Sequence, residues 1–269
     1  MNRVLSVQDL SCLGKCSLGV ALPVLSAMGC AATALPTTLL STHTAFPGPY
    51  RKSLTEDLKP ICDHWKSIGA AFETVSTGYL ADPMQVETVC AVLDAFDDAL
   101  HIVDPVMGDN GKLYSAITRD HVRAMEKLCR RADVILPNVT EAAMLTGMEY
   151  RETADLAYYR QLLEGLKAFG AEAVIITGVS LEEGKLGCFG YDAQGEFSCQ
   201  NEKIHRRCHG TGDLFAAVVA GAMTRGKTAR QAAALAAEFT CRVVENTPNS
   251  TPFGVEFEAV LPWLWENMK

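Results

Sequence analysis

Residues 206–223 read R-R-C-H-G-T-G-D-L-F-A-A-V-V-A-G-A-M, and this stretch decides the fold. The Gly-Thr-Gly turn at 210–212 can adopt backbone angles that are closed to bulkier residues. Asp213 then opens a run with no polar side chain before Thr224. A helix that is apolar on every side is typical of the core of a sizeable domain. We therefore predict a buried helix whose N-terminus is fixed at this turn.

The front of this helix suits an anion, because several unpaired N–H groups and the positive end of the helix dipole point at one place. Asp213 would lie beside that anion and accept a proton from a substrate hydroxyl. We expect the dipole to lower the pKa of Asp213, which still suffices for phosphoryl transfer, since that reaction asks mainly for positioning. The structural alternative is an ordinary glycine turn in which Asp213 stabilises the first helical turn, and G-x-G-D alone does not decide between them.

Length and charge limit the class of protein. A chain of 269 residues can bury a substantial core and still form one α/β domain, so we predict a single domain over residues 1–269. The 24 basic and 32 acidic residues give a net charge of −8, which argues against a nucleic-acid partner and against a membrane surface. If the protein binds a nucleotide, the positive charge that contacts the phosphates must be local. It could come from a metal ion, the helix dipole, or the cluster Lys203, Arg206 and Arg207.

The cysteines and the start of the chain bear on its location. Ten cysteines are scattered through apolar segments without a C-x-x-C pair, so we expect reduced, mostly buried thiols. The start M-N-R-V-L-S-V-Q-D lacks the apolar core of a signal peptide, and no uninterrupted apolar run approaches the length of a membrane span. These features predict a cytoplasmic protein.

Strand-like and helix-like segments alternate along the chain, which implies a mainly parallel sheet covered on both faces, with an antiparallel edge. We predict strands at 3–7, 31–40, 72–77, 100–103, 134–136 and 173–177, a loop at 8–15, an antiparallel hairpin from 186–191 and 196–199, and helices at 18–28, 54–68, 82–96, 118–131, 153–169, 228–246 and 256–266.

Acidic residues follow two of the predicted strands. Asp104 and Asp109 come after the strand at 100–103, where open α/β sheets bind ligands, and could hold a hydrated magnesium ion. An Asp-Pro turn explains them equally well. Asn138 and Glu141 have the spacing of a helix cap in which the glutamate returns to the N-terminus. The functional alternative places Glu141 near a metal ion and phosphates, and spacing does not separate the two.

The order of these pieces resembles the ribokinase superfamily, and within it the vitamin kinase branch of pyridoxal and pyridoxamine kinases. The resemblance covers essentially the whole chain. It implies a three-layer αβα fold with no separate lid domain. Its motifs are Val7-Gln8 followed by Gly14, Ser41-Thr42-His43-Thr44, Gly78-Tyr79-Leu80, Asp104-Pro105-Val106-Met107-Gly108-Asp109, Asn138-Val139-Thr140-Glu141, Thr177-Gly178 and Gly210-Thr211-Gly212-Asp213.

The resemblance also implies a role for individual residues. Asp213 corresponds to the catalytic base, and the backbone of Gly210, Thr211 and Gly212 to the anion hole for the γ-phosphate of ATP. The remaining roles are magnesium and phosphate binding by Asp104, Asp109 and Glu141 with Asn138 nearby, nucleotide binding by Thr177, Gly178, Lys185 and Gly187, and vitamin binding by Asp9, Leu40, Thr44 and Tyr79.

Asp9 departs from the family pattern, because pyridoxal kinases commonly carry serine there. Its carboxylate could pair with a protonated ring nitrogen or a substrate amine through a charge-assisted hydrogen bond. Alternatively, Asp9 caps a nearby turn. The sequence favours neither interpretation.

The resemblance implies an ATP- and Mg²⁺-dependent kinase that phosphorylates the 5'-hydroxymethyl group of pyridoxal, pyridoxine or pyridoxamine in pyridoxal 5'-phosphate salvage. It also implies a homodimer and allows a monovalent cation such as K⁺. The nearest alternative is a hydroxymethylpyrimidine kinase of thiamine synthesis, whose substrate is also a small aromatic ring bearing CH₂OH. A non-catalytic sensor of nucleotide or pyridoxal phosphate on the same fold is the third hypothesis.

Overall fold

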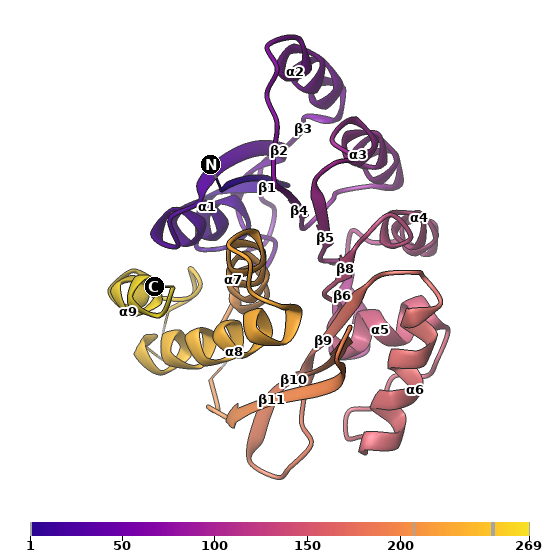
Figure 1. Cartoon of the computed structure of the whole chain (residues 1–269), viewed down its shortest axis with the longest axis vertical. Helices are drawn as coiled ribbons and strands as arrows, with labels where there is room; N and C mark the ends of the chain where they lie inside the picture. The colour runs from indigo at the N-terminus through magenta and orange to yellow at the C-terminus, as the bar shows by residue number, and fades with distance from the viewer. Residues whose placement is uncertain (1, 207, 249–250, 269) are drawn as a thin grey trace.

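A nine-stranded sheet forms the centre of the computed structural model, which describes residues 2–206, 208–248 and 251–268 (Figure 1). The strand order is β11-β10-β9-β8-β5-β4-β1-β2-β3. The strands are β1 (Arg3–Leu13), β2 (Ala31–Thr42), β3 (Arg51–Ser53), β4 (Thr74–Thr77), β5 (Leu100–Val103), β8 (Val134–Ile135), β9 (Ala173–Val179), β10 (Lys185–Asp192) and β11 (Gly195–Glu202), and a separate small sheet pairs β6 (Gly108–Asp109) with β7 (Lys112–Leu113).

The central strands from β9 to β2 all pair in parallel. The hairpin β10–β11 pairs antiparallel at one edge, as predicted. A second antiparallel strand, β3, closes the other edge and was not predicted. Both β3 and the β6–β7 hairpin have only two or three residues per strand, which is too short for a period of two to be read.

Helices cover both faces of the sheet and complete the three layers (Figure 1). Alternate residues of β1 divide between the faces, with Leu5 and Val7 in one apolar core and Val4 in the other. One face carries α2 (Thr55–Ser67), α3 (Pro83–Ala95), α4 (Arg119–Cys129), α5 (Val139–Thr146) and α6 (Leu156–Lys167), and the other carries α1 (Leu18–Ala27), α7 (Thr211–Thr224), α8 (Ala229–Asn246), the 3₁₀ turn η1 (Glu258–Val260) and α9 (Leu261–Asn267).

The loop predicted at 8–15 is wrong, because β1 continues to Leu13. Its polar side chains are satisfied within the strand: Gln8 Nε2 donates to Ser6 Oγ over 2.8 Å, and Asp9 accepts from Ser11 Oγ over 3.0 Å. A register shift against β2 between Gln8 and Leu10 accommodates them. Mutually bonded polar residues can therefore lie in a buried strand, where a reading by polarity alone predicts a loop.

Helix α7 is buried as predicted, and every residue from Leu214 to Ala222 is buried. It begins at Thr211, two residues before the predicted start at Asp213. A Cβ atom at Gly221 would lie 2.6 Å from Met28 Sδ, so the glycine lets α7 approach the end of α1 closely. Within the described residues, no helix is long and apolar enough to cross a bilayer.

Candidate active site

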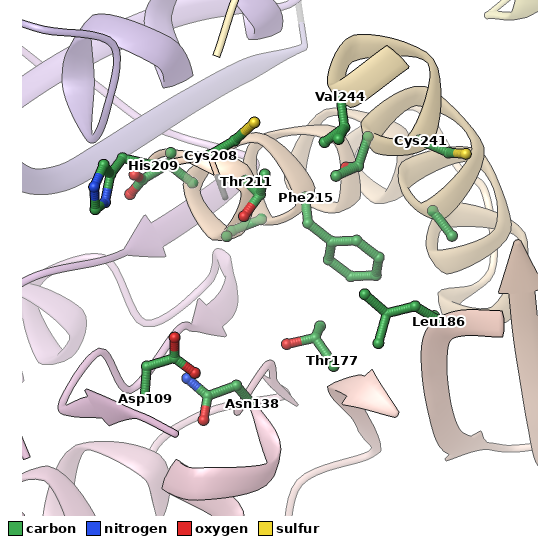
Figure 2. Close-up of a pocket in the computed structure, with 18 of the residues that line it drawn as sticks. Asp109, Asn138, Thr177, Leu186, Cys208, His209, Thr211, Phe215, Cys241 and Val244 are labelled. Carbon is green, nitrogen blue, oxygen red and sulfur yellow. The ribbon is translucent and has the colours of Figure 1, made fainter. Parts of the chain in front are cut away.

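A cavity of about 450 Å³ opens beyond the carboxyl ends of β5, β8 and β9. It is bounded by the hairpin β10–β11, by the N-terminus of α7 and by α8. Figure 2 shows Phe215 of α7 and Leu186 of β10 pointing toward each other on one side, while Asp109 and Asn138 lie on the other side. The cavity therefore has an apolar part and a polar part.

The N-terminus of α7 faces this cavity without a side-chain cap, because its N-cap residue is Gly210. Gly210 has φ +87°, and a Cβ atom there would lie 2.2 Å from the carbonyl oxygen of Lys15. Only glycine fits this position without strain. A Cβ atom at Gly212 would meet no atom within 4 Å, so the space above that residue is open. An anion can reach the first-turn amides from that side.

Asp213 lies half-buried in the wall of the cavity. Burial raises the pKa of its carboxyl to about 6, and the charge of Asp9 acts in the same direction. The pKa of Asp213 is therefore raised and not lowered as expected, because loss of hydration outweighs the hydrogen bond from Ser17. A carboxylate with a pKa near 6 is a better proton acceptor at neutral pH than an ordinary aspartate.

Ser17 connects Asp213 to Asp9. Its N–H donates to the Asp213 carboxylate, and its hydroxyl donates to Asp9 Oδ1 over 2.5 Å. Ser17 has φ +48° and ψ −130°, a conformation that residues with a side chain rarely adopt. Asp9 is only 2% exposed, and its second oxygen accepts from Ser11. These bonds support the interpretation that Asp9 holds a turn.

Glu141 and Asn138 form the predicted capping box at the start of α5. Asn138 Oδ1 accepts from the Glu141 N–H over 3.0 Å, and Glu141 Oε2 accepts from the Asn138 N–H over 2.9 Å. Glu141 Oε1 also accepts from the N–H groups of Met107 and Gly108, at 2.9 and 3.5 Å. Burial raises the pKa of Glu141 to about 7 in spite of these bonds. Both of its oxygens therefore organise backbone while the residue lines the cavity.

The Asp104 carboxylate differs from that of Glu141 because it accepts no hydrogen bond from the residues that the structure describes. Burial raises the pKa of Asp104 well above its usual range, and the charges of Glu141 and Asp213 raise it further. None of these three carboxylates forms an ion pair with a described basic residue. Three neighbouring acids without a counter-ion disfavour one another's charged forms, so a bound cation would favour their ionisation.

The acids fit a hydrated magnesium ion better than a closed metal cage. Over residues 2–206, 208–248 and 251–268, no three His, Cys, Asp or Glu residues are placed to hold a metal together. Asp104, Asp109 and Glu141 nevertheless line one cavity, although the Asp109 carboxylate accepts from the N–H and the Nδ2 of Asn110, each over 2.8 Å. Mg²⁺ keeps several waters and usually takes one or two carboxylates plus phosphates, and Asp104 has free oxygens for this.

The remaining predicted residues divide between the cavity and its surroundings. Thr177, Gly178 and Gly187 line the cavity with Gly210, Thr211 and Gly212, whereas Lys185 lies outside it and pairs with Glu182 at 3.4 Å. The residues predicted to bind the vitamin do not line the cavity: Asp9 and Leu40 are buried, Thr44 is exposed, and the Tyr79 hydroxyl accepts from Arg51 Nη2 over 2.7 Å.

Other side chains of the cavity were not predicted from the sequence. Phe215 belongs to the apolar run of α7, and Leu186 and Val244 also read as core residues, so no pattern marked them. Arg206, proposed as a local positive charge, instead donates through Nη1 to the carbonyl oxygens of 244, 245 and 247 at the end of α8, at 3.0, 2.8 and 2.6 Å. Arg207, the third member of that cluster, lies outside the described residues.

Comparison with known proteins gives a consistent result. The family model for phosphomethylpyrimidine kinase matches residues 22–256. The crystal structure of pyridoxal kinase from Lactobacillus plantarum is 35% identical, with a TM-score of 0.90 over 98% of this chain and 97% of that chain. Two Bacillus subtilis proteins are also similar. The hydroxymethylpyrimidine/phosphomethylpyrimidine kinase is 32% identical over 72% of this chain and 67% of its own, and the pyridoxine kinase is 30% identical over 67% of each.

Proposed function

The chain belongs to the phosphomethylpyrimidine kinase family, and from that premise we propose that it transfers the γ-phosphate of ATP to the hydroxymethyl group of a vitamin B6 compound. It is an enzyme that phosphorylates an alcohol group, and the hypothesis of a non-catalytic sensor is therefore wrong. The observation that carries the proposal is Asp213 beside the uncapped front of α7, in a cavity that also holds Asp104 and Glu141.

The two parts of the cavity match the two parts of ATP. Phe215, Leu186 and Val244 supply apolar surface for a purine ring. Figure 2 shows Thr177 between this surface and Asp109, and Gly178 also lines the cavity, so the phosphate chain would run past them toward α7. This placement supports ATP as the phosphate donor.

Asp213 would act as the base. Its carboxylate accepts the proton of the substrate hydroxyl while that oxygen bonds to the γ-phosphorus, and the bond from the β–γ bridging oxygen breaks. The Ser17 N–H holds the carboxylate, and the amides at the front of α7 receive the developing charge of the phosphoryl oxygens. Positioning and electrostatics supply most of the acceleration.

Asp104 would hold Mg²⁺ through its free oxygens, with Glu141 nearby and Asp109 at the rim of the cavity. When bound, Mg²⁺ neutralises charge on the phosphates and lets neighbouring carboxylates stay ionised. A monovalent cation such as K⁺, a homodimer and a cytoplasmic location stay predictions from the sequence and its family.

Hydroxymethylpyrimidine is the second candidate substrate. The match to the family model for phosphomethylpyrimidine kinase supports this candidate. Identity is 32% to the Bacillus subtilis hydroxymethylpyrimidine/phosphomethylpyrimidine kinase and 30% to the pyridoxine kinase of the same organism. These two values do not separate the substrates.

A substrate panel tests the proposal. Purified protein with ATP and Mg²⁺ is given pyridoxal, pyridoxine, pyridoxamine and hydroxymethylpyrimidine, and kcat/KM is measured for each. We expect the highest value for a B6 compound. A preference for hydroxymethylpyrimidine would overturn the substrate but not the reaction. Asp9→Ser, measured in the same panel, shifts the ranking only if Asp9 contributes to specificity, so an unchanged ranking leaves Asp9 as a turn-holding residue.

A further inference from the structure

The hairpin β10–β11 carries two cysteines directly opposite each other. Cys188 and Cys199 are register partners, and directly opposed residues on neighbouring strands point to the same face. Both side chains pack into the apolar core beneath α8. Their thiols also hydrogen bond to each other. Opposed residues have Cα atoms about 4.5–5.5 Å apart, which lies within the range of about 4.4–6.8 Å that a disulfide spans.

The two thiols have different environments. Cys188 is fully buried, whereas Cys199 is half-buried. The hydrogen bond from Cys188 lowers the pKa of Cys199, and the nearby Arg230 guanidinium acts in the same direction. Arg230 is itself fixed, since its Nε and Nη2 donate to the Asp192 carboxylate over 2.9 and 2.6 Å. Cys199 therefore has the character of an attacking thiolate and Cys188 that of a resolving thiol.

We propose that Cys188 and Cys199 are a reversible redox couple that a peroxide oxidises to a cross-strand disulfide. The Cys199 thiolate attacks one peroxide oxygen, so that an S–O bond forms, the O–O bond breaks and hydroxide leaves to become water. The Cys188 sulfur then attacks the Cys199 sulfur. An S–S bond forms, the S–O bond breaks, and the oxygen leaves as a second water with the Cys188 proton. Two thiols lose two electrons, and hydrogen peroxide gains them.

The couple adjoins the apolar part of the cavity. Gly187 precedes Cys188 and lines the cavity. The next register pair on the same face as the cysteines is Leu186 with Asn201, and both of these residues also line the cavity. A Cβ atom at Gly187 would lie 1.8 Å from the carbonyl oxygen of Cys199, so the strands have no slack there. A new covalent bond at this point would shift the wall against which the purine packs. This consequence rests on the proposed use of ATP.

Peptide mapping of the full chain tests the couple without any assay of activity. Reduced protein is treated with hydrogen peroxide, free thiols are alkylated, and the unreduced digest is analysed by mass spectrometry. We expect a Cys188–Cys199 cross-link that dithiothreitol removes. Cys188→Ser and Cys199→Ser abolish it, and Cys90→Ala, remote on α3, retains it. Overoxidation of Cys199 without a cross-link, or a cross-link between other cysteines, would overturn the proposal.

A second measurement tests the consequence for the nucleotide. The KM for ATP is compared before oxidation, after it, and after dithiothreitol. We expect a several-fold reversible change that Cys199→Ser does not show. Thermal unfolding of each reduced variant shows whether it folds. A cross-link with unchanged KM supports the couple and overturns its effect on the cavity wall, whereas a protein that maps as expected but never turns over ATP contradicts the proposed function alone.

Discussion

Two helix N-termini face the same cavity, and they differ in whether side chains cap their free N–H groups. The start of α5 is closed by its own side chains, since Asn138 and Glu141 satisfy each other's backbone N–H groups. The start of α7 has Gly210 as its cap and open space above Gly212. The backbone N–H groups at the start of α7 have no side-chain cap and are therefore available to a ligand. We infer that α5 supports the site and α7 binds the phosphoryl group.

Replacing the acidic residue at the start of each helix by its amide should give the largest difference in activity and stability between α7 and α5. Asp213→Asn should lower kcat by roughly 10²–10⁴-fold, because the proposed general base is lost. It should not lower the melting temperature at pH 7.5. A carboxyl whose pKa is raised in the folded state destabilises the fold as pH rises from the unfolded pKa through about 6, and the amide removes that cost.

Glu141→Gln is the matched variant at α5. Its carboxylate accepts three backbone N–H groups, and an amide has only one oxygen to accept them. We expect a loss of roughly 1–3 kcal/mol in unfolding free energy, measured by denaturant titration. Equal stability losses in the two variants would remove the distinction between the helices.

Gly212→Ala should have the next largest effect. The added methyl group enters open space, so thermal unfolding should be unchanged, but it occupies the approach to the α7 amides. We expect kcat/KM for ATP to fall by about 10²-fold, the cost of displacing a reacting group by about 1 Å. Gly210→Ala is the control for strain, because its φ of +87° and the Lys15 carbonyl at 2.2 Å predict a loss of stability instead. Unchanged kinetics of Gly212→Ala would show that no phosphate binds there.

The pH dependence of kcat/KM tests the role of Asp213 at the start of α7, and the expected change is smaller. If Asp213 is the base, kcat/KM rises with pH and levels off above its pKa of about 6. Activity at pH 5 should then be about tenfold below that at pH 7. Bound Mg²⁺ should move the midpoint downward, because a cation favours ionised carboxylates. A profile that is flat between pH 5 and 7 would contradict the assignment.

Asn138→Ala gives the smallest expected change. It removes a helix cap, and such losses cost about 1 kcal/mol, or roughly 2–4 °C in melting temperature for a chain of this size. Thr118→Ala, which uncaps α4 away from the cavity, is the matched control for stability. Similar destabilisation with an additional loss of activity only in Asn138→Ala would show that the α5 cap also orders the site.

The sequence predicted the arrangement of strands and the buried helix well, because the apolar run after Asp213 and the turns at strand ends are local signals. It did not predict the pKa direction of Asp213, which depends on burial by residues distant in the chain. It also left open whether Glu141 caps a helix or serves the site, and the structure shows that it caps α5 and lines the cavity. Assignment of residues 1–269 to one domain stays a prediction.

Side-chain roles that depend on tertiary contacts were the hardest to predict. Arg206 belonged to one of three candidate sources of local positive charge, but its guanidinium donates to carbonyl oxygens at the end of α8. For Asp9 the sequence left substrate binding and the capping of a turn equally open, and its oxygens accept from two serines nearby. The sequence shows that such charged side chains are present but not which residues they contact, and these contacts determine their role.

Ser17 links Asp9 in β1 to Asp213, the proposed base at the start of α7. Because β1 lies between β4 and β2, a chain in which β1 has not paired has a divided sheet and also lacks a correctly held Asp213. During refolding, turnover of ATP should therefore appear only after β1 has paired with its two neighbours.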